Sequence, residues 1–182
     1  IILDFIMPTL SGPHNTSSFK KGIGWKIALS ALVITAIGVC IYQFIVEQNT
    51  AWFNHHNIPY FAPAPWFSKL MWIISYLLIG GTFGIVWHIR TVKRYPIIKK
   101  FAKETLILLG ILLVLNFLFL VFLIHFDLPI LALIDMLIIS GFTYGMIRRV
   151  IRLDRIAAFL LLPYLLWIIY GVIVTIGIVA IN

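Results

Sequence analysis

Residues Trp52–Trp87 read WFNHHNIPYFAPAPWFSKLMWIISYLLIGGTFGIVW, a proline- and aromatic-rich segment that leads directly into a long apolar helical pattern. Spacings of three and four residues place a stripe of rings and one glycine on a single helix face: Trp72, Tyr76, Gly80, Phe83 and Trp87. The prolines before the helix stiffen a loop that is able to cover this face. The segment therefore predicts a pocket with a lid, suited to a flat apolar ligand.

The composition predicts an integral membrane protein. The chain has 182 residues, of which 62% are hydrophobic and 11% charged, and its mean hydropathy is +1.07. These values are too apolar for a water-soluble domain of this length. Apolar windows long enough to cross a bilayer occur at Ile23–Val46, Trp66–Ile89, Thr105–Ile124, Leu128–Ile147 and Ile156–Ile181. We expect an all-α membrane protein with a single bundle of five transmembrane helices.

The basic residues predict the orientation of this bundle. Of the 14 Lys and Arg residues, all but Lys69 precede or begin the first span or lie around the second and fourth connections, on one side of a five-span serpentine. By the positive-inside rule, we expect a cytoplasmic N-terminus and an outer C-terminus, as in a bacterial inner membrane. Contact with anionic lipid headgroups explains the charge of +8, and we expect no nucleic-acid partner.

One domain is expected. Residues 1–21 contain prolines and a Ser/Thr/Asn cluster without signal-peptide features, so we interpret them as a flexible N-terminal tail before a five-helix domain at 22–182. The single cysteine, Cys40, falls inside the first span and is interpreted as a buried structural thiol.

Two polar side chains inside the spans are candidates for ligand contact. Asn116 lies near the middle of the third span and Asp135 in the first part of the fourth. Polar groups are costly in hydrocarbon and should face the bundle interior. Each is able either to contact a ligand or to pin helices together, and for Asp135 structural pairing is favoured.

The fifth span adds a second aromatic face, formed by Tyr164, Trp167 and Tyr170 near Pro163. A proline inside a helix removes one backbone donor and can open a cavity beside it. Trp167 lies near mid-span, unlike the tryptophans of an interfacial belt. We therefore predict that Trp72 and Trp167 flank a planar guest.

Other motifs, present or absent, limit the classes of function that are possible. Gly80-x-x-x-Gly84 allows close helix approach, inside the bundle or in a homodimer. His55, His56 and His125 are interpreted as ordinary loop histidines, and no metal site is predicted. The sequence contains no Walker loop, G-x-S-x-G elbow or H-E-x-x-H motif, so conventional hydrolysis and nucleotide chemistry have no visible machinery.

Taken together, these residues resemble the TspO/MBR family, the tryptophan-rich sensory proteins related to the mitochondrial translocator, or peripheral benzodiazepine receptor. The family pattern W-Y-x-x-L-x-K-P-x-F-x-P-P is matched at Trp52, Pro59, Phe61 and Pro63, with Phe53, His56, Ile58 and Ala64 at the other positions. Later family motifs are matched at Trp66, Trp72, Tyr76, Gly80, Leu115, Asn116, Asp135, Pro163, Tyr164, Leu165 and Trp167.

The resemblance implies a five-helix receptor, often dimeric, that binds tetrapyrroles such as protoporphyrin IX and haem, and hydrophobic drugs of the benzodiazepine type. It implies a role in porphyrin homeostasis or stress response, with no required cofactor. The expected ligand-binding residues are Trp52, Pro59, Phe61, Pro63, Trp72, Tyr76, Asn116, Asp135, Tyr164, Trp167 and Tyr170. Alternatives are a light- and oxygen-dependent porphyrin-degrading enzyme, with Trp72 and Trp167 as its catalytic residues, and a porphyrin transporter.

Departures from the family pattern predict altered specificity. The family lysine is replaced by Ile58, which leaves Lys69 as the candidate cation near the pocket mouth. Porphyrin propionates favour such a cation, so we expect weaker porphyrin affinity than in relatives. The last helix has Thr175 in place of the family asparagine, and residues 171–182 contain no Tyr, Lys or Arg for the family's sterol-recognition pattern.

Overall fold

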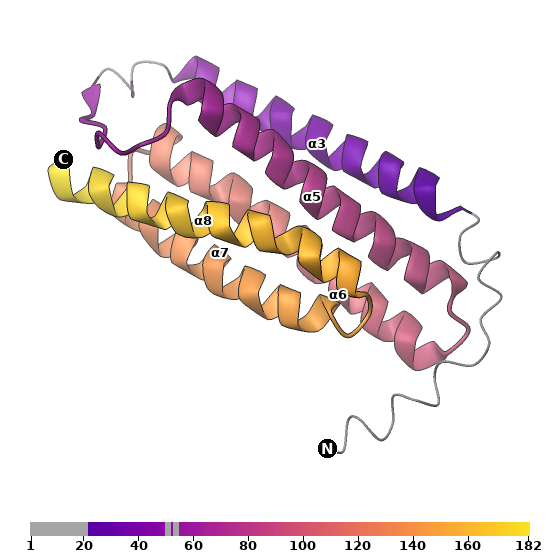
Figure 1. Ribbon diagram of the computed structural model, residues 1–182. Helices are drawn as coiled ribbons and strands as arrows, with labels where there is room; N and C mark the ends of the chain where they lie inside the picture. The colour runs from indigo at the N-terminus through magenta and orange to yellow at the C-terminus, as the bar shows by residue number, and fades with distance from the viewer. Residues whose placement is uncertain (1–21, 50–51, 53–54) are drawn as a thin grey trace.

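The structure is a computed structural model of the chain, and it describes residues 22–49, 52 and 55–182. Within these residues, five helices are long and apolar enough to cross a membrane, as predicted (Figure 1). In chain order they are α3 (Ile23–Gln48), α5 (Pro65–Val92), α6 (Pro96–Leu120), α7 (Pro129–Val150) and α8 (Arg155–Ile181). The tail expected at residues 1–21 and the family position at Phe53 lie outside the described residues.

The starts of four helices follow from local sequence. Pro65, Pro96 and Pro129 each occupy the first turn of a helix, where a missing backbone N–H costs nothing and the fixed φ favours helix. α8 begins instead at an N-cap, because the Asp154 carboxylate accepts a hydrogen bond from the backbone N–H of Ala157 at 2.8 Å.

The third span is longer at both ends than its apolar window. α6 begins at Pro96, before the predicted start at Thr105, and it runs directly into η2, a π-helical turn at Val121–His125. The hydropathy window missed the first turns because they carry several lysines. Lysine side chains reach the headgroup level from a helix end while their stems stay in apolar surroundings, so these charges are compatible with a spanning helix.

The central helix of the bundle is α5, which packs against α3, α6 and α8, while α7 packs against α6 and α8. α3 lies along the outer side of α5 (Figure 1) and is the least buried span, with 17% of its apolar window inside against 56% for α5. The expectation of a buried Cys40 is therefore wrong, because this residue is exposed on α3. The antiparallel order brings the start of α3 and the α5–α6 and α7–α8 connections to one end, here called the basic end.

The glycine pair of α5 is used inside the bundle. A Cβ atom added at Gly80 would lie 2.6 Å from the Cα of Ala31, and one added at Gly84 would lie 2.6 Å from the Cα of Ile27. Both neighbours are backbone atoms of α3. The hydroxyl of Ser30 also donates to the carbonyl oxygen of Gly80 at 2.8 Å. Small residues therefore let α3 and α5 approach closely.

This packing divides the aromatic stripe of α5. The ring of Tyr76 fills the space left by Gly38 of α3, and Trp87 meets Trp25 edge-on with ring centroids 5.4 Å apart. The stripe therefore faces α3 over most of its length. Trp72 is the residue of this stripe that lines the cavity described next.

Candidate functional site

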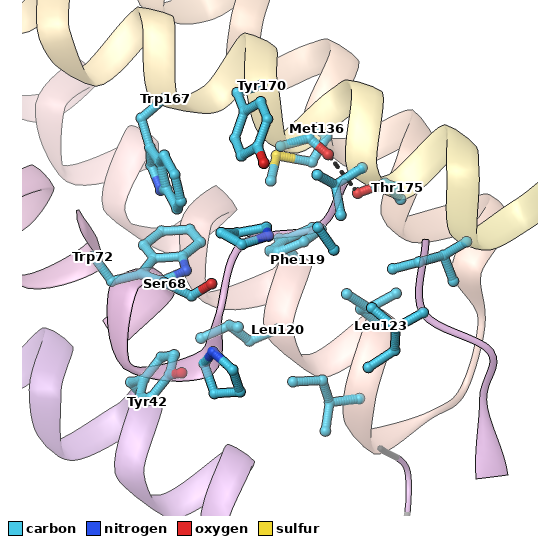
Figure 2. A pocket seen from close by; sticks show the side chains of 18 of the residues that line it. Tyr42, Ser68, Trp72, Phe119, Leu120, Leu123, Met136, Trp167, Tyr170 and Thr175 are labelled. Carbon is cyan, nitrogen blue, oxygen red and sulfur yellow. Dashed lines mark hydrogen bonds between the residues drawn. The ribbon is translucent and has the colours of Figure 1, made fainter. Parts of the chain in front are cut away.

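A cavity of about 360 Å³ lies at the end of the bundle opposite the basic end, beneath the loop between α3 and α5. Its walls come from this loop, the first turns of α5, the end of α6 with η2, and the second half of α8 (Figure 2). Tyr42 of α3 and Met136 of α7 complete the lining. The described part of the loop, residue 52 and residues 55–64, is called the lid below.

Trp72 and Trp167 both line this cavity. Figure 2 shows their indoles projecting from α5 and α8 at the same end of it. Trp72 is buried and stacks on Phe119, with centroids 6.2 Å apart and planes inclined by 26°. Trp167 is half-buried, and its ring meets Phe67 edge-on at 6.1 Å. Packing against these neighbours fixes the orientation of both indoles.

The described side chains that line the cavity are uncharged. Among the described residues that line the cavity there is no Lys, Arg, His, Asp or Glu; its polar side chains are hydroxyls and indole N–H groups. Two hydroxyls are already engaged, since Tyr170 donates to the carbonyl oxygen of Phe61 at 2.6 Å and Thr175 to that of Gly171 at 2.8 Å. Lys69 lies behind Tyr42 and Trp72, in a crevice toward α3. The expected cation is therefore not in the cavity wall.

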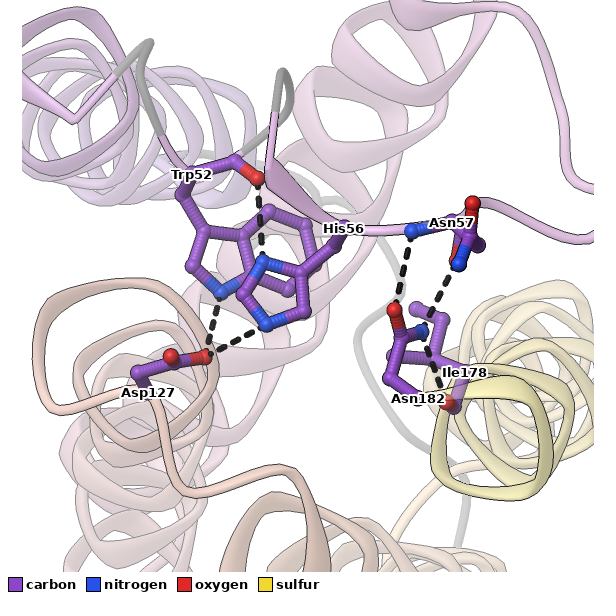
Figure 3. Close-up of polar contacts among 6 residues, drawn as sticks. All are labelled: Trp52, His56, Asn57, Asp127, Ile178 and Asn182. Carbon is purple, nitrogen blue, oxygen red and sulfur yellow. Dashed lines mark hydrogen bonds and ion pairs between the residues drawn. The ribbon is translucent and has the colours of Figure 1, made fainter.

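Asp127 ties one end of the lid to the turn between η2 and α7 (Figure 3). Its carboxylate Oδ1 accepts a hydrogen bond from the indole Nε1 of Trp52 at 2.9 Å and lies 3.0 Å from Nε2 of His56. The two rings stack with centroids 4.5 Å apart. Nδ1 of His56 lies 3.1 Å from the carbonyl oxygen of Trp52. Both imidazole nitrogens face acceptors, so the protonated ring satisfies both while the neutral ring donates to one.

A second set of contacts ties the lid to α8. The side-chain amide of Asn182 accepts from the backbone N–H of Asn57 and donates to its carbonyl oxygen, both at 2.9 Å (Figure 3). Pro59 and Phe61 pack on Gly177, where an added Cβ would lie 2.7 Å and 2.8 Å from their rings. The absence of a side chain at Gly177 thus allows the lid to lie directly on α8.

Four predicted site residues lie outside the cavity lining, in the bundle core. Tyr164 donates to Oδ1 of Asn116 at 2.8 Å, while Nδ2 of Asn116 donates to the carbonyl oxygen of Leu112 at 2.6 Å. Both side chains are fully buried, so this pair links α6 to α8. Asp135 is buried, with no hydrogen-bond partner for Oδ2 among the described residues, and Tyr76 faces α3.

The predicted set thus separates into three groups. Trp52, Pro63, Trp72, Trp167 and Tyr170 line the cavity; Pro59 and Phe61 hold the lid on α8; Tyr76, Asn116, Asp135 and Tyr164 lie in the core.

Sequence reasoning missed three residues that position the lid. Asp127 could have been found from the sequence, because an acidic residue in a short turn between two apolar helices is unusual. Its backbone is left-handed with φ 54°, which aspartate tolerates. No sequence pattern pointed to Gly177 or Asn182, since their roles depend on contacts between distant parts of the chain. No group of three His, Cys, Asp or Glu side chains that could hold a metal ion occurs among the described residues.

The fold and the site define a polytopic α-helical membrane protein with an aromatic-walled cavity beneath a tethered loop. The model of the TspO/MBR family matches residues 29–181, and the chain belongs to this family. It is 27% identical over 146 residues to the tryptophan-rich protein TspO of Archaeoglobus fulgidus, an alignment that covers 80% of this chain and 90% of that relative.

Proposed function

We propose that this protein is a membrane receptor for flat hydrophobic molecules of the tetrapyrrole class, such as protoporphyrin IX and haem. The observation that carries the proposal is that Trp72 and Trp167, from different helices, line one cavity. Offset stacking on an aromatic ring contributes about 0.5–1.5 kcal/mol beyond the burial of apolar area. The cavity volume of about 360 Å³ falls in the range of roughly 300–1,000 Å³ that is usual for small-molecule sites.

The uncharged lining defines how such a ligand binds. The macrocycle stacks between the indoles, and its carboxylate substituents remain at the mouth beside the lid, in contact with water. Aromatic drug-like molecules of the benzodiazepine type use the same walls. Binding needs no cofactor. The physiological role is porphyrin homeostasis or stress response, in a bacterial inner membrane with the basic end toward the cytoplasm.

Quenching of tryptophan fluorescence by protoporphyrin IX tests the site. The Trp72→Phe/Trp167→Phe double variant should lose most of the quenching and bind at least about tenfold more weakly, from two stacking contacts of this size. The matched control, Trp25→Phe/Trp66→Phe, removes two exposed indoles outside the cavity and should leave the affinity unchanged. Equal affinities in the two double variants would refute the assignment.

A comparison of ligands tests the role of charge. A carboxylate that meets a charged partner gains roughly 1.5–3 kcal/mol per hydrogen bond, and the described lining offers no such partner. Protoporphyrin IX and its uncharged dimethyl ester should therefore bind within about threefold of each other. A strong preference for the diacid would show that a cation outside the described lining takes part.

Light-driven porphyrin oxidation by molecular oxygen is a second candidate function. The arrangement that favours it is a set of ring contacts at the cavity wall. Trp72 lies 5.9 Å from Tyr76, which is outside the lining, and Trp167 lies 5.6 Å from Tyr170 within the lining. Such rings can pass an electron to or from an excited guest. Illumination in air should bleach bound porphyrin faster in the native protein than in Trp72→Phe at equal occupancy, and equal rates would reject this activity.

A further inference from the structure

A second cavity, of about 390 Å³, lies between the first turns of α6 and the last turns of α7. It is at the basic end of the bundle, far from the lid, and it takes no part in the function proposed above. Three arginines, Arg148, Arg149 and Arg152, contribute to its lining, and its remaining walls are apolar. A membrane protein with a basic pocket between two spans presents a recognition site for an anionic lipid headgroup.

One of these arginines is fixed in the wall. Arg149 donates from Nε to the hydroxyl of Thr105 at 3.0 Å and from a terminal nitrogen to Oε2 of Glu104 at 2.6 Å. Its guanidinium carbon also lies 4.1 Å from the centroid of the Phe101 ring. These contacts hold Arg149 across the α6–α7 interface and balance the charge of Glu104, the acidic residue next to the cavity.

The other two arginines carry charge without an acidic partner. Arg148 and Arg152 are exposed and four positions apart, the first in the last turn of α7 and the second just after this helix ends. Neither forms an ion pair within the described part of the chain. Within the described residues, the side chain of Arg148 makes one hydrogen bond, a long contact of 3.4 Å with the hydroxyl of Tyr144. Guanidinium groups bind phosphate oxygens in a two-pronged geometry, so the pair presents free donors to a phosphodiester.

The apolar part of the cavity indicates what is attached to that phosphate. Leu108 and Phe142 extend the cavity along the bundle, and Gly145 leaves a gap in which an added Cβ would meet nothing within 4 Å. A free phosphate ion would leave these walls uncovered. A zwitterionic headgroup would bring its ammonium close to the arginines. An anionic phospholipid matches both parts.

We propose that this cavity binds one anionic phospholipid, with its phosphodiester on Arg148 and Arg152 and the upper part of an acyl chain along the furrow over Gly145. The lipid bridges α6 and α7 on the membrane-facing side of the Arg149–Glu104 pair. It occupies a defined site, in contrast to the diffuse attraction that any basic loop exerts on an anionic bilayer.

Native mass spectrometry of the detergent-purified full chain tests the charge requirement, with phosphatidylglycerol and phosphatidylcholine of identical acyl chains as probes. We expect one retained phosphatidylglycerol and at least about tenfold weaker retention of phosphatidylcholine. Arg148→Gln/Arg152→Gln should abolish the preference. Arg90→Gln/Arg94→Gln removes the same charge from the other basic connection and should preserve it. Equal losses in the two double variants would overturn the proposal.

A second pair of variants tests the furrow while keeping every charge. Gly145→Leu fills the open space in the cavity, whereas Gly141→Leu adds the same side chain on the same helix, at a position with equal free space outside the cavity lining. Leucine has higher helix propensity than glycine, so both variants should fold. Retention should fall at least about tenfold in Gly145→Leu alone. Unchanged retention there, or full displacement of the lipid by millimolar inorganic phosphate, would overturn the assignment to a lipid.

Discussion

The indole Nε1 of Trp52 lies 2.9 Å from the carboxylate Oδ1 of Asp127, across 75 positions of sequence. Trp52 lines the cavity, and Asp127 lies in the turn that joins η2 to α7. This turn is itself closed by a hydrogen bond from the backbone N–H of Leu128 to the carbonyl oxygen of Phe122 at 2.8 Å. The connection between two spans therefore fixes the position of the lid over the cavity.

Substitution of Asp127 should weaken the contacts that hold the lid over the cavity. Asp127→Asn suits the left-handed backbone and keeps an acceptor for Trp52, but it removes the negative charge beside His56. Asp127→Ala removes both the acceptor and the charge. A hydrogen bond to a charged group contributes about 1.5–3 kcal/mol when buried, and less here because Asp127 is 54% exposed. We expect dissociation of protoporphyrin IX, followed by stopped-flow fluorescence, to accelerate about threefold in Asp127→Asn and about tenfold in Asp127→Ala.

Glu104→Gln is the control for that experiment, because it removes an acidic side chain at the opposite end of the bundle. It should leave dissociation unchanged. Identical rates in the native protein and Asp127→Ala would show that this tether does not limit ligand release.

Gly177 should control how closely the lid can lie on α8. Gly177→Ala places a Cβ 2.7 Å from Cγ of Pro59 and 2.8 Å from Cζ of Phe61, which is too short for a non-bonded contact. The lid is held by a few hydrogen bonds, so we expect it to move outward, with about threefold to tenfold weaker binding of porphyrin in equilibrium titrations. Gly110→Ala, where an added Cβ meets nothing within 4 Å, should bind like the native protein.

The packing of α3 on α5 should depend on the two glycines at their crossing. Gly80→Ala brings a Cβ within 2.6 Å of the Cα of Ala31, and neither backbone can yield without separating the helices. Overpacking of this kind costs typically 1–3 kcal/mol. We expect a lower thermal unfolding temperature in detergent for Gly80→Ala and Gly84→Ala, and no decrease for Gly24→Ala, which has open space around the new methyl group.

The five spans were predictable because lipid imposes a length of apolar sequence on each, and the antiparallel order follows from their connections. Trp72 and Trp167 were predictable as a pair because Trp72 belongs to the ring stripe of the second span, and Trp167 is a mid-span indole that an interfacial belt does not explain. The role of Tyr76 was not predictable from spacing. A stripe on one helix face shows that the residues share a neighbour, but whether that neighbour is a ligand or α3 depends on Gly38, a residue on another helix.

The same limit applies to Asn116 and Tyr164, whose hydrogen bond joins α6 to α8 outside the cavity lining. Tyr164→Phe leaves Oδ1 of Asn116 without this donor, and Asn116→Leu removes the other partner. Interhelical hydrogen bonds in membrane proteins contribute about 0.6 kcal/mol on average and up to about 1.7 kcal/mol. A double-mutant cycle on the free energy of unfolding in detergent should give a coupling energy of this size.

A binding measurement distinguishes two roles for Asn116 and Tyr164. One is the structural hydrogen bond between helices, and the other is the ligand contact that the family motifs imply. Since neither side chain lines the cavity, Tyr164→Phe should keep the affinity for protoporphyrin IX within about twofold of the native protein, even as stability falls. Tyr170→Phe is the matched comparison, because it removes a tyrosine hydroxyl that donates to the lid at Phe61 and should weaken binding. A larger loss of affinity in Tyr164→Phe than in Tyr170→Phe would place the ligand deeper in the bundle, against the Asn116–Tyr164 pair.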